Sequence, residues 1–92
     1  MINQNELEGL GFKLIAEKPG LWGNTITFYK KVDNGHIIEG HDTTEIFITK
    51  DRNFISIEID HQSSWDYRGK RLVFIGKCDS IDFLQQIIKA VI

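Results

Sequence analysis

Cysteine and proline are both scarce in this chain, which has one residue of each among 92. A single Cys78 cannot form an internal disulfide, so we expect a reducing, cytoplasmic location. The opening residues MINQNELEGL contain no charged-then-apolar signal segment, which agrees with that location. Long apolar runs are missing too: the richest stretch, 81–92, is interrupted by polar residues and is too short to span a bilayer, so we expect no membrane partner.

Specific catalytic motifs are also missing. The sequence contains no glycine-rich phosphate loop and none of the patterns H-E-x-x-H, C-x-x-C or G-x-S-x-G. Its histidines, His36, His41 and His61, have acidic neighbours but match no known metal-ligand spacing. We therefore expect no catalytic residues, no metal and no cofactor, and a small enzyme or a metalloprotein is the weaker alternative.

The composition is that of an ordinary globular domain. Hydrophobic residues make up 41% and charged residues 26%, unlike a disordered chain. A chain of 92 residues can build one core, which predicts a single domain over residues 1–92. The net charge of −2 argues against a generally basic nucleic-acid binder, although the charge is unevenly distributed. Asp33 to Asp60 holds seven acidic and two basic residues, whereas Gln62 to Lys77 is basic.

A short helix is predicted near the N-terminus. The side-chain oxygen of Asn3 or Asn5 can accept a hydrogen bond from the first turn and so cap the helix. Gly9 or Gly11 can end it, because glycine accepts the left-handed backbone that follows many helices. We expect about two helical turns.

A second, amphipathic helix is predicted over 81–92, where apolar residues recur at helical spacing and polar residues fill the opposite side. Asp79 or Ser80 can cap its start. If Asp79 is the cap, Cys78 precedes it and can pack on Phe83 as a hydrophobic staple. The alternative for Cys78 is a reactive thiol at a helix N-terminus.

Between the helices, the pattern is that of an antiparallel sheet with one face in water. Apolar and polar residues alternate most clearly from Thr25 to Val32. We expect the apolar set, Ile26, Phe28 and Val32, to be the buried face of this strand. The stretch 71–75 is apolar on both faces, which predicts a central or covered strand. Tight turns are predicted at 33–35 and 50–53. The predicted strands are 12–17, 25–32, 36–39, 44–49, 54–61 and 71–75.

These elements predict an α+β fold: an antiparallel sheet of about five or six strands, with a short N-terminal helix and an amphipathic C-terminal helix packed on one face. No internal repeat or linker interrupts it. An exposed strand edge can pair with another copy, so the oligomeric state stays open.

The most informative stretch for function is 65–71, WDYRGKR, which places two large aromatic residues among three cations. Trp, Tyr and Arg are the residues that dominate binding interfaces, and they also stack bases and pair phosphates. The alternative is structural: the aromatic side chains cover one end of the sheet while the cations are solvated. A second tryptophan, Trp22 in the loop PGLWG, has the same two alternatives: it fills the core or it serves as a binding anchor. The candidate binding residues are Trp65, Tyr67, Arg68, Lys70, Arg71 and Trp22.

The segments ELEGLGF (6–12) and FIGKCDSIDFLQQIIKAV (74–91) resemble small uncharacterised proteins encoded by phages and mobile elements of Bacteroidetes-like bacteria. Such proteins often bind and disable a host complex, including CRISPR effectors. The resemblance therefore implies a non-enzymatic protein-binding module that inhibits a host defence or nucleic-acid-processing complex. In that role the acidic stretch Asp33 to Asp60 would meet a basic nucleic-acid channel. The alternative function is a small RNA- or single-stranded-DNA-binding module that uses the 65–71 loop.

Overall fold

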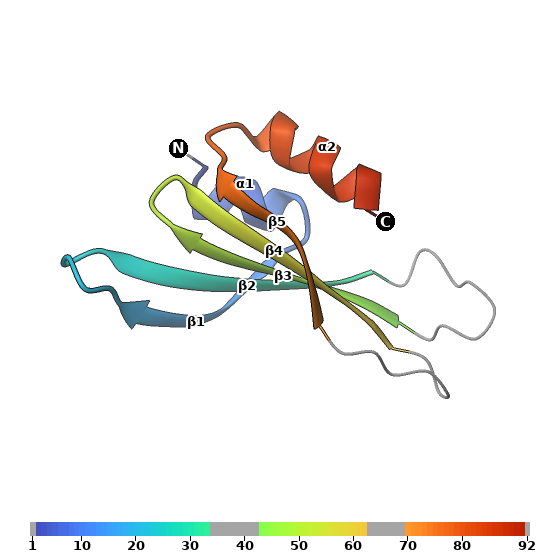
Figure 1. The fold of residues 1–92 in the computed structure, drawn as a ribbon, viewed down its shortest axis with the longest axis horizontal. Helices are drawn as coiled ribbons and strands as arrows, with labels where there is room; N and C mark the ends of the chain where they lie inside the picture. Colours follow the sequence, from blue (N-terminus) through green and yellow to red (C-terminus); the bar gives the residue numbers. More distant parts are fainter. Residues whose placement is uncertain (1, 34–42, 63–69, 92) are drawn as a thin grey trace.

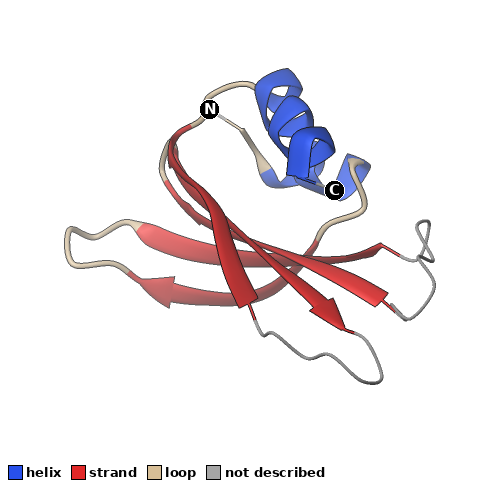
Figure 2. Cartoon of the chain, turned by 45° about the vertical axis from the view of Figure 1, so that its right-hand side comes forward, coloured by secondary structure: helices blue, strands red, loops and turns tan. Residues whose placement is uncertain are grey.

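A five-stranded antiparallel sheet is the centre of the structure, a computed structural model that describes residues 2–33, 43–62 and 70–91 (Figure 1). Strands that follow one another in sequence are neighbours in the sheet. Both helices lie on one face of it (Figure 2). This confirms the α+β fold; the return strand predicted at 36–39 lies outside the described residues. In chain order the elements are α1 (Gln4–Gly9), β1 (Lys13–Pro19), β2 (Thr25–Asp33), β3 (Thr43–Asp51), β4 (Phe54–Gln62), β5 (Lys70–Lys77) and α2 (Ile81–Val91).

Helix α1 starts at a capping box built on Asn3. The Asn3 side-chain oxygen accepts a hydrogen bond from the Glu6 backbone N–H at 2.8 Å, and the Glu6 carboxylate accepts one from the Asn3 N–H at 3.2 Å. Gly11, with φ of 94°, provides the left-handed turn that leads into β1. The prediction of an asparagine cap is confirmed, with Asn3 as the residue.

Helix α2 is capped by Ser80, whose hydroxyl oxygen accepts a hydrogen bond from the Phe83 N–H at 3.4 Å. Because Ser80 rather than Asp79 is the cap, Cys78 does not occupy the staple position. Phe83 instead meets Phe74 of β5 edge to face, with ring centres 6.1 Å apart. The apolar side of α2 packs on the core through Ile81, Leu84, Ile87 and Ile88.

One row of apolar side chains crosses all five strands beneath the helices. Residues that pair across neighbouring strands point to the same face, and the register joins one residue from each strand. Buried isoleucines beside this row in β3 and β4 also belong to the core. The buried residues outside the sheet are Ile2, Leu7, Phe12, Cys78 and Leu84. The row, called the core row below, is Leu14, Tyr29, Ile48, Ile57 and Phe74.

The face of β2 that we expected to be buried is the wrong one. Tyr29 lies in the core and is 3% exposed, whereas Val32 is 46% exposed. Tyr29 pairs with Ile48 of β3, so the register places Ile26, Phe28 and Val32 on the side away from the helices. A strand with apolar residues on both faces does not itself show which face the helices cover.

The prediction that 71–75 is a central or covered strand is also wrong. β5 is an edge strand, bonded only to β4 among the described strands. Leu72 and Ile75 lie on the side away from the helices and are largely exposed. These two apolar side chains therefore belong to the exposed side of the sheet and are not part of the core.

Each edge strand carries a register irregularity of the bulge type. In β1 the pairing with β2 shifts between Leu14 and Ala16, which leaves Ile15 as an extra residue. In β5 the partners of Ile57 and Glu58 are Phe74 and Leu72, so Val73 is extra there. Such bulges increase the local twist of both edges.

Truncation of one isoleucine on each face of the sheet should show, by its effect on stability, which face is packed in the core. Ile57→Ala, at a residue that is fully buried, should lower the free energy of unfolding by about 2–5 kcal/mol. Ile75→Ala, at a residue that is 70% exposed, should lower it by less than about 1 kcal/mol. Urea denaturation of both variants measures the difference, and equal losses would contradict the assignment of the two faces.

Candidate functional site

The structure places Trp22 at the tip of the β1–β2 hairpin, which projects beyond the other strands (Figures 1 and 2). Trp22 is 83% exposed and its neighbour Leu21 is 96% exposed. Trp22 therefore does not fill the core, and the two side chains form an apolar tip. Lys70 and Arg71 are exposed at the start of β5, whereas Trp65, Tyr67 and Arg68 lie outside the described residues.

The Trp22 turn and the 65–71 stretch are connected to opposite ends of the sheet. In an antiparallel sheet with this strand order, successive turns alternate between its two ends. The turn at 20–24 follows β1, while the segment between β4 and β5 starts at Gln62 and returns at Lys70. A single surface built from both loops is therefore not what the topology favours.

The acidic stretch does not form an exposed acidic surface in its described part. Glu45, Asp51 and Glu58 are only partly exposed, and Asp60 is buried. Glu45 is paired with Lys30 at 3.3 Å, and Asp51 accepts a hydrogen bond from the Asn24 side chain. These contacts make the described carboxylates poor candidates for contacts with a basic channel.

A larger candidate site is the side of the sheet away from the helices, called the open face below. Within the described residues, no helix covers it (Figure 2). Its centre is a hollow of about 330 Å³ that Phe28, Phe47, Glu58 and Lys70 help to line. Exposed aliphatic side chains surround the hollow. They are Ile15, Val32, Leu72 and Ile75.

Lysine ammonium groups lie over the phenylalanine rings of the open face. Two of them share Phe47: Lys70 Nζ is 4.0 Å from its ring centre, and Lys30 Nζ is 5.7 Å from it. The other two pairs are Lys18 over Phe28 and Lys77 over Phe54, each at 5.9 Å. Aromatic rings and cations thus alternate across all five strands.

The sequence analysis did not identify the open face. Its residues are spread over all five strands at alternate positions, and no local motif joins them. The available signal was the pairing of the alternating runs TITFYKK and TEIFITK, which puts Phe28, Lys30 and Phe47 on one side of the sheet. This signal can be used only if the pairing of residues between β2 and β3 is known, and the sequence between the two strands does not reveal that pairing.

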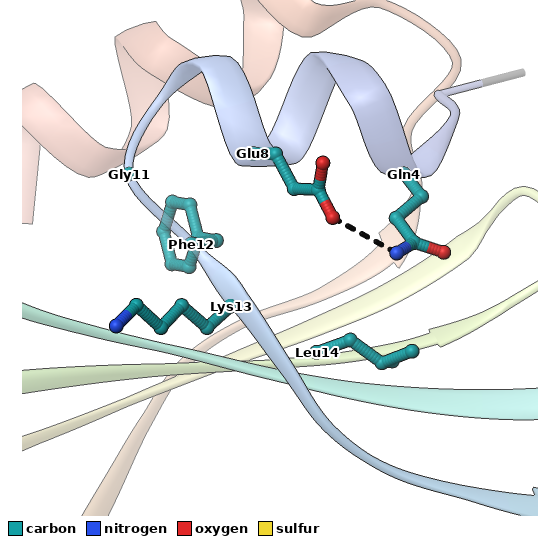
Figure 3. Close-up of a pocket in the computed structure, with 6 residues that line it drawn as sticks. All are labelled: Gln4, Glu8, Gly11, Phe12, Lys13 and Leu14. Atoms are coloured by element: carbon teal, nitrogen blue, oxygen red, sulfur yellow. Dashed lines mark hydrogen bonds between the residues drawn. The ribbon is translucent and has the colours of Figure 1, made fainter.

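A second hollow, of about 570 Å³, lies between α1 and the start of β1 (Figure 3). Two of its polar side chains bond to each other: the Gln4 amide donates to the Glu8 carboxylate at 2.9 Å. Phe12 belongs to the core and is almost fully buried. Lys13 also lines the hollow and is exposed. One exposed lysine beside a pair of groups that are already bonded does not define a binding site, and we do not assign the hollow a ligand.

The described residues include no group of three or more His, Cys, Asp or Glu side chains that could hold a metal ion. Cys78 is buried, and its thiol donates a hydrogen bond to the Ser80 carbonyl at 3.5 Å. Burial raises the pKa of this thiol, a backbone hydrogen bond at Ser80 that favours the thiolate partly opposes the rise, and the negative charge of Asp79 adds to it. These features favour a packing role over a reactive thiol.

The environment of Cys78 predicts slow labelling by thiol reagents in the native protein. The thiolate is the reacting species, and a raised pKa lowers the thiolate fraction at every pH below it. At pH 8 the native chain should react with Ellman's reagent far more slowly than the same chain in urea. Absorbance at successive times measures both rates, and equal rates would contradict the packing role.

No helix in the described parts of the chain is long and apolar enough to cross a membrane. Comparison of the chain with known proteins finds no matching family model, no matching curated protein and no matching solved structure. Its function must therefore be inferred from the residues and surfaces described above.

Proposed function

We propose that the protein is a non-enzymatic protein-binding module that contacts its partner through Leu21 and Trp22 at the β1–β2 tip. The observation that carries the proposal is the near-complete exposure of both side chains on a projecting hairpin. Tryptophan buries a large area on binding and is among the residues that contribute most to interfaces. A partner pocket would receive the two side chains together.

The turn that carries this tip is held in place before any partner binds. The Gly20 N–H donates to the Asn24 carbonyl at 2.7 Å, and the Asn24 side chain donates to Asp51 of β3. Gly23 has a φ of 77°, which favours glycine at this position. A fixed turn loses less conformational entropy on binding, which supports its use as an anchor.

The resemblance to phage and mobile-element proteins implies a partner class: a host defence complex or a nucleic-acid-processing complex, CRISPR effectors included. This identity remains a prediction, as do cytoplasmic location and the absence of catalysis. The alternative, RNA or single-stranded DNA bound by the 65–71 loop, also remains a prediction, because only Lys70 and Arg71 of that loop are described.

Trp22→Ala should weaken partner binding about thirtyfold or more, without loss of stability. The side chain makes little contact with the fold, so the free energy of unfolding should change by less than about 0.5 kcal/mol. A tryptophan anchor in a pocket contributes about 2 kcal/mol or more to binding. The partner recovered from a bacterial lysate by the immobilised wild-type protein should be purified and titrated against both proteins.

Two matched variants serve as controls for this experiment. Trp22→Phe keeps an aromatic side chain at the tip and should retain part of the affinity. Lys89→Ala changes an exposed residue of α2, away from the tip, and should bind as the wild type does. Equal affinity of Trp22→Ala and wild type would contradict the anchor, and failure to recover a partner would contradict the proposed function.

A further inference from the structure

We propose that the open face binds single-stranded nucleic acid, with bases stacked on its phenylalanine rings and phosphates bound by its lysines. This site is separate from the β1–β2 tip and does not depend on it. It also differs from the 65–71 loop, with which it shares only Lys70, because its rings lie on β2, β3 and β4. The arrangement of the rings, the placement of the cations and the burial of the acids support this binding.

The phenylalanine rings lie together on the open face of the sheet. Phe28 pairs with Thr49 and Phe47 with Lys30, so the two phenylalanines are diagonal neighbours on adjacent strands. Diagonal neighbours in a sheet lie about 7–8 Å apart, within reach of large side chains. Phe54 lies on the same face of β4 and is half exposed. Phe28 and Phe47 are partly exposed, and base stacking on such rings tolerates every base.

Each ring has a cation beside it. The ammonium groups of Lys18, Lys70 and Lys77 lie 5.9, 4.0 and 5.9 Å from the centres of Phe28, Phe47 and Phe54 respectively. These lysines are exposed and long, so their ammonium groups can move from a ring to a phosphate. A nucleotide presents a flat base joined through one sugar to a phosphate, which matches a ring and a neighbouring ammonium group.

The most exposed charged side chains of the open face are lysines. Its lysines at 13, 18, 70 and 77 are all exposed, whereas its described acids are partly or fully buried. Glu45 is further neutralised by Lys30. A second copy of this chain placed face to face would bring lysines against lysines, which disfavours self-association through this face. The surface fits a polyanion with flat apolar groups.

A single strand fits this surface better than a duplex does. In a duplex the bases stack on one another, and a flat protein surface meets only phosphates and sugars. In a single strand the bases are free to lie on Phe28, Phe47 and Phe54 while the phosphates meet the lysines. An acidic protein segment would use the lysines but would leave the rings without a stacking partner, so the experiment includes a polyglutamate competitor.

Fluorescence anisotropy of a labelled oligothymidylate of about 16 nucleotides tests the proposal directly. The full-length protein should bind it at low salt, and the affinity should fall steeply as salt rises. A duplex of the same length should bind more weakly, and polyglutamate at equal charge should compete poorly. No binding at low salt, or competition by polyglutamate as effective as that by unlabelled oligonucleotide, would overturn the proposal.

Three variants assign the roles of the residues. Phe47→Leu keeps an apolar side chain but removes the ring, and should weaken binding about fivefold or more with an unchanged salt slope. Lys70→Gln should weaken binding and reduce the slope of log affinity against log salt by about 0.7. Lys89→Gln, on α2 and away from the open face, should bind as the wild type does.

Glu58→Gln is a variant that we expect to strengthen nucleic-acid binding, whereas the variants above weaken it. Glu58 lines the hollow beside Phe47 and Lys70, where its charge repels a phosphate. Its neutralisation should tighten binding a fewfold, while a general loss of structure would weaken it. Circular dichroism of each variant confirms that the sheet is intact. Wild-type affinity in a folded Phe47→Leu protein would overturn the stacking role, and weaker binding by folded Glu58→Gln would overturn the charge argument.

Discussion

The core row is the interaction on which the rest of the structure depends. Leu14, Tyr29, Ile48, Ile57 and Phe74 come from five different strands and meet only if every pair of neighbouring strands adopts the observed register. A slip of one residue in any strand would turn its side chains to the other face and remove its member from the row. The burial of this row beneath the helices therefore selects the register of the whole sheet.

Both surfaces proposed to bind follow from that register. With the core row turned toward α1 and α2, the alternate residues of each strand must face away, and there the structure gathers phenylalanines, aliphatic side chains and lysines. The β1–β2 hairpin extends beyond the part of the sheet that the helices cover, which leaves Leu21 and Trp22 without a core to join. The open face and the tip are thus consequences of a core that occupies one side only.

The sequence was sufficient for elements whose signals are local. An asparagine cap, Asn3 or Asn5, was predicted for α1 and is Asn3 in the structure, and the alternation of Ile55, Ile57 and Ile59 identifies the inner face of β4. It was insufficient on β2 and β5, where apolar residues occupy both faces and only the pairing with β3 and β4 decides which face is buried. The same residues that misled the burial prediction, Phe28, Val32, Leu72 and Ile75 among them, form the open face. Surfaces used for binding are where patterns of burial are expected to fail.

The bulges at Ile15 and Val73 affect how readily another strand can add to the edges of this sheet. An edge strand with regular hydrogen-bonding groups is a template on which another chain can add a strand, and repeated addition leads to fibres. Here both edges are irregular, and β1 ends in a proline, which cannot donate a backbone hydrogen bond. The sheet can therefore expose apolar side chains on one face while its irregular edges disfavour the addition of a strand from another chain.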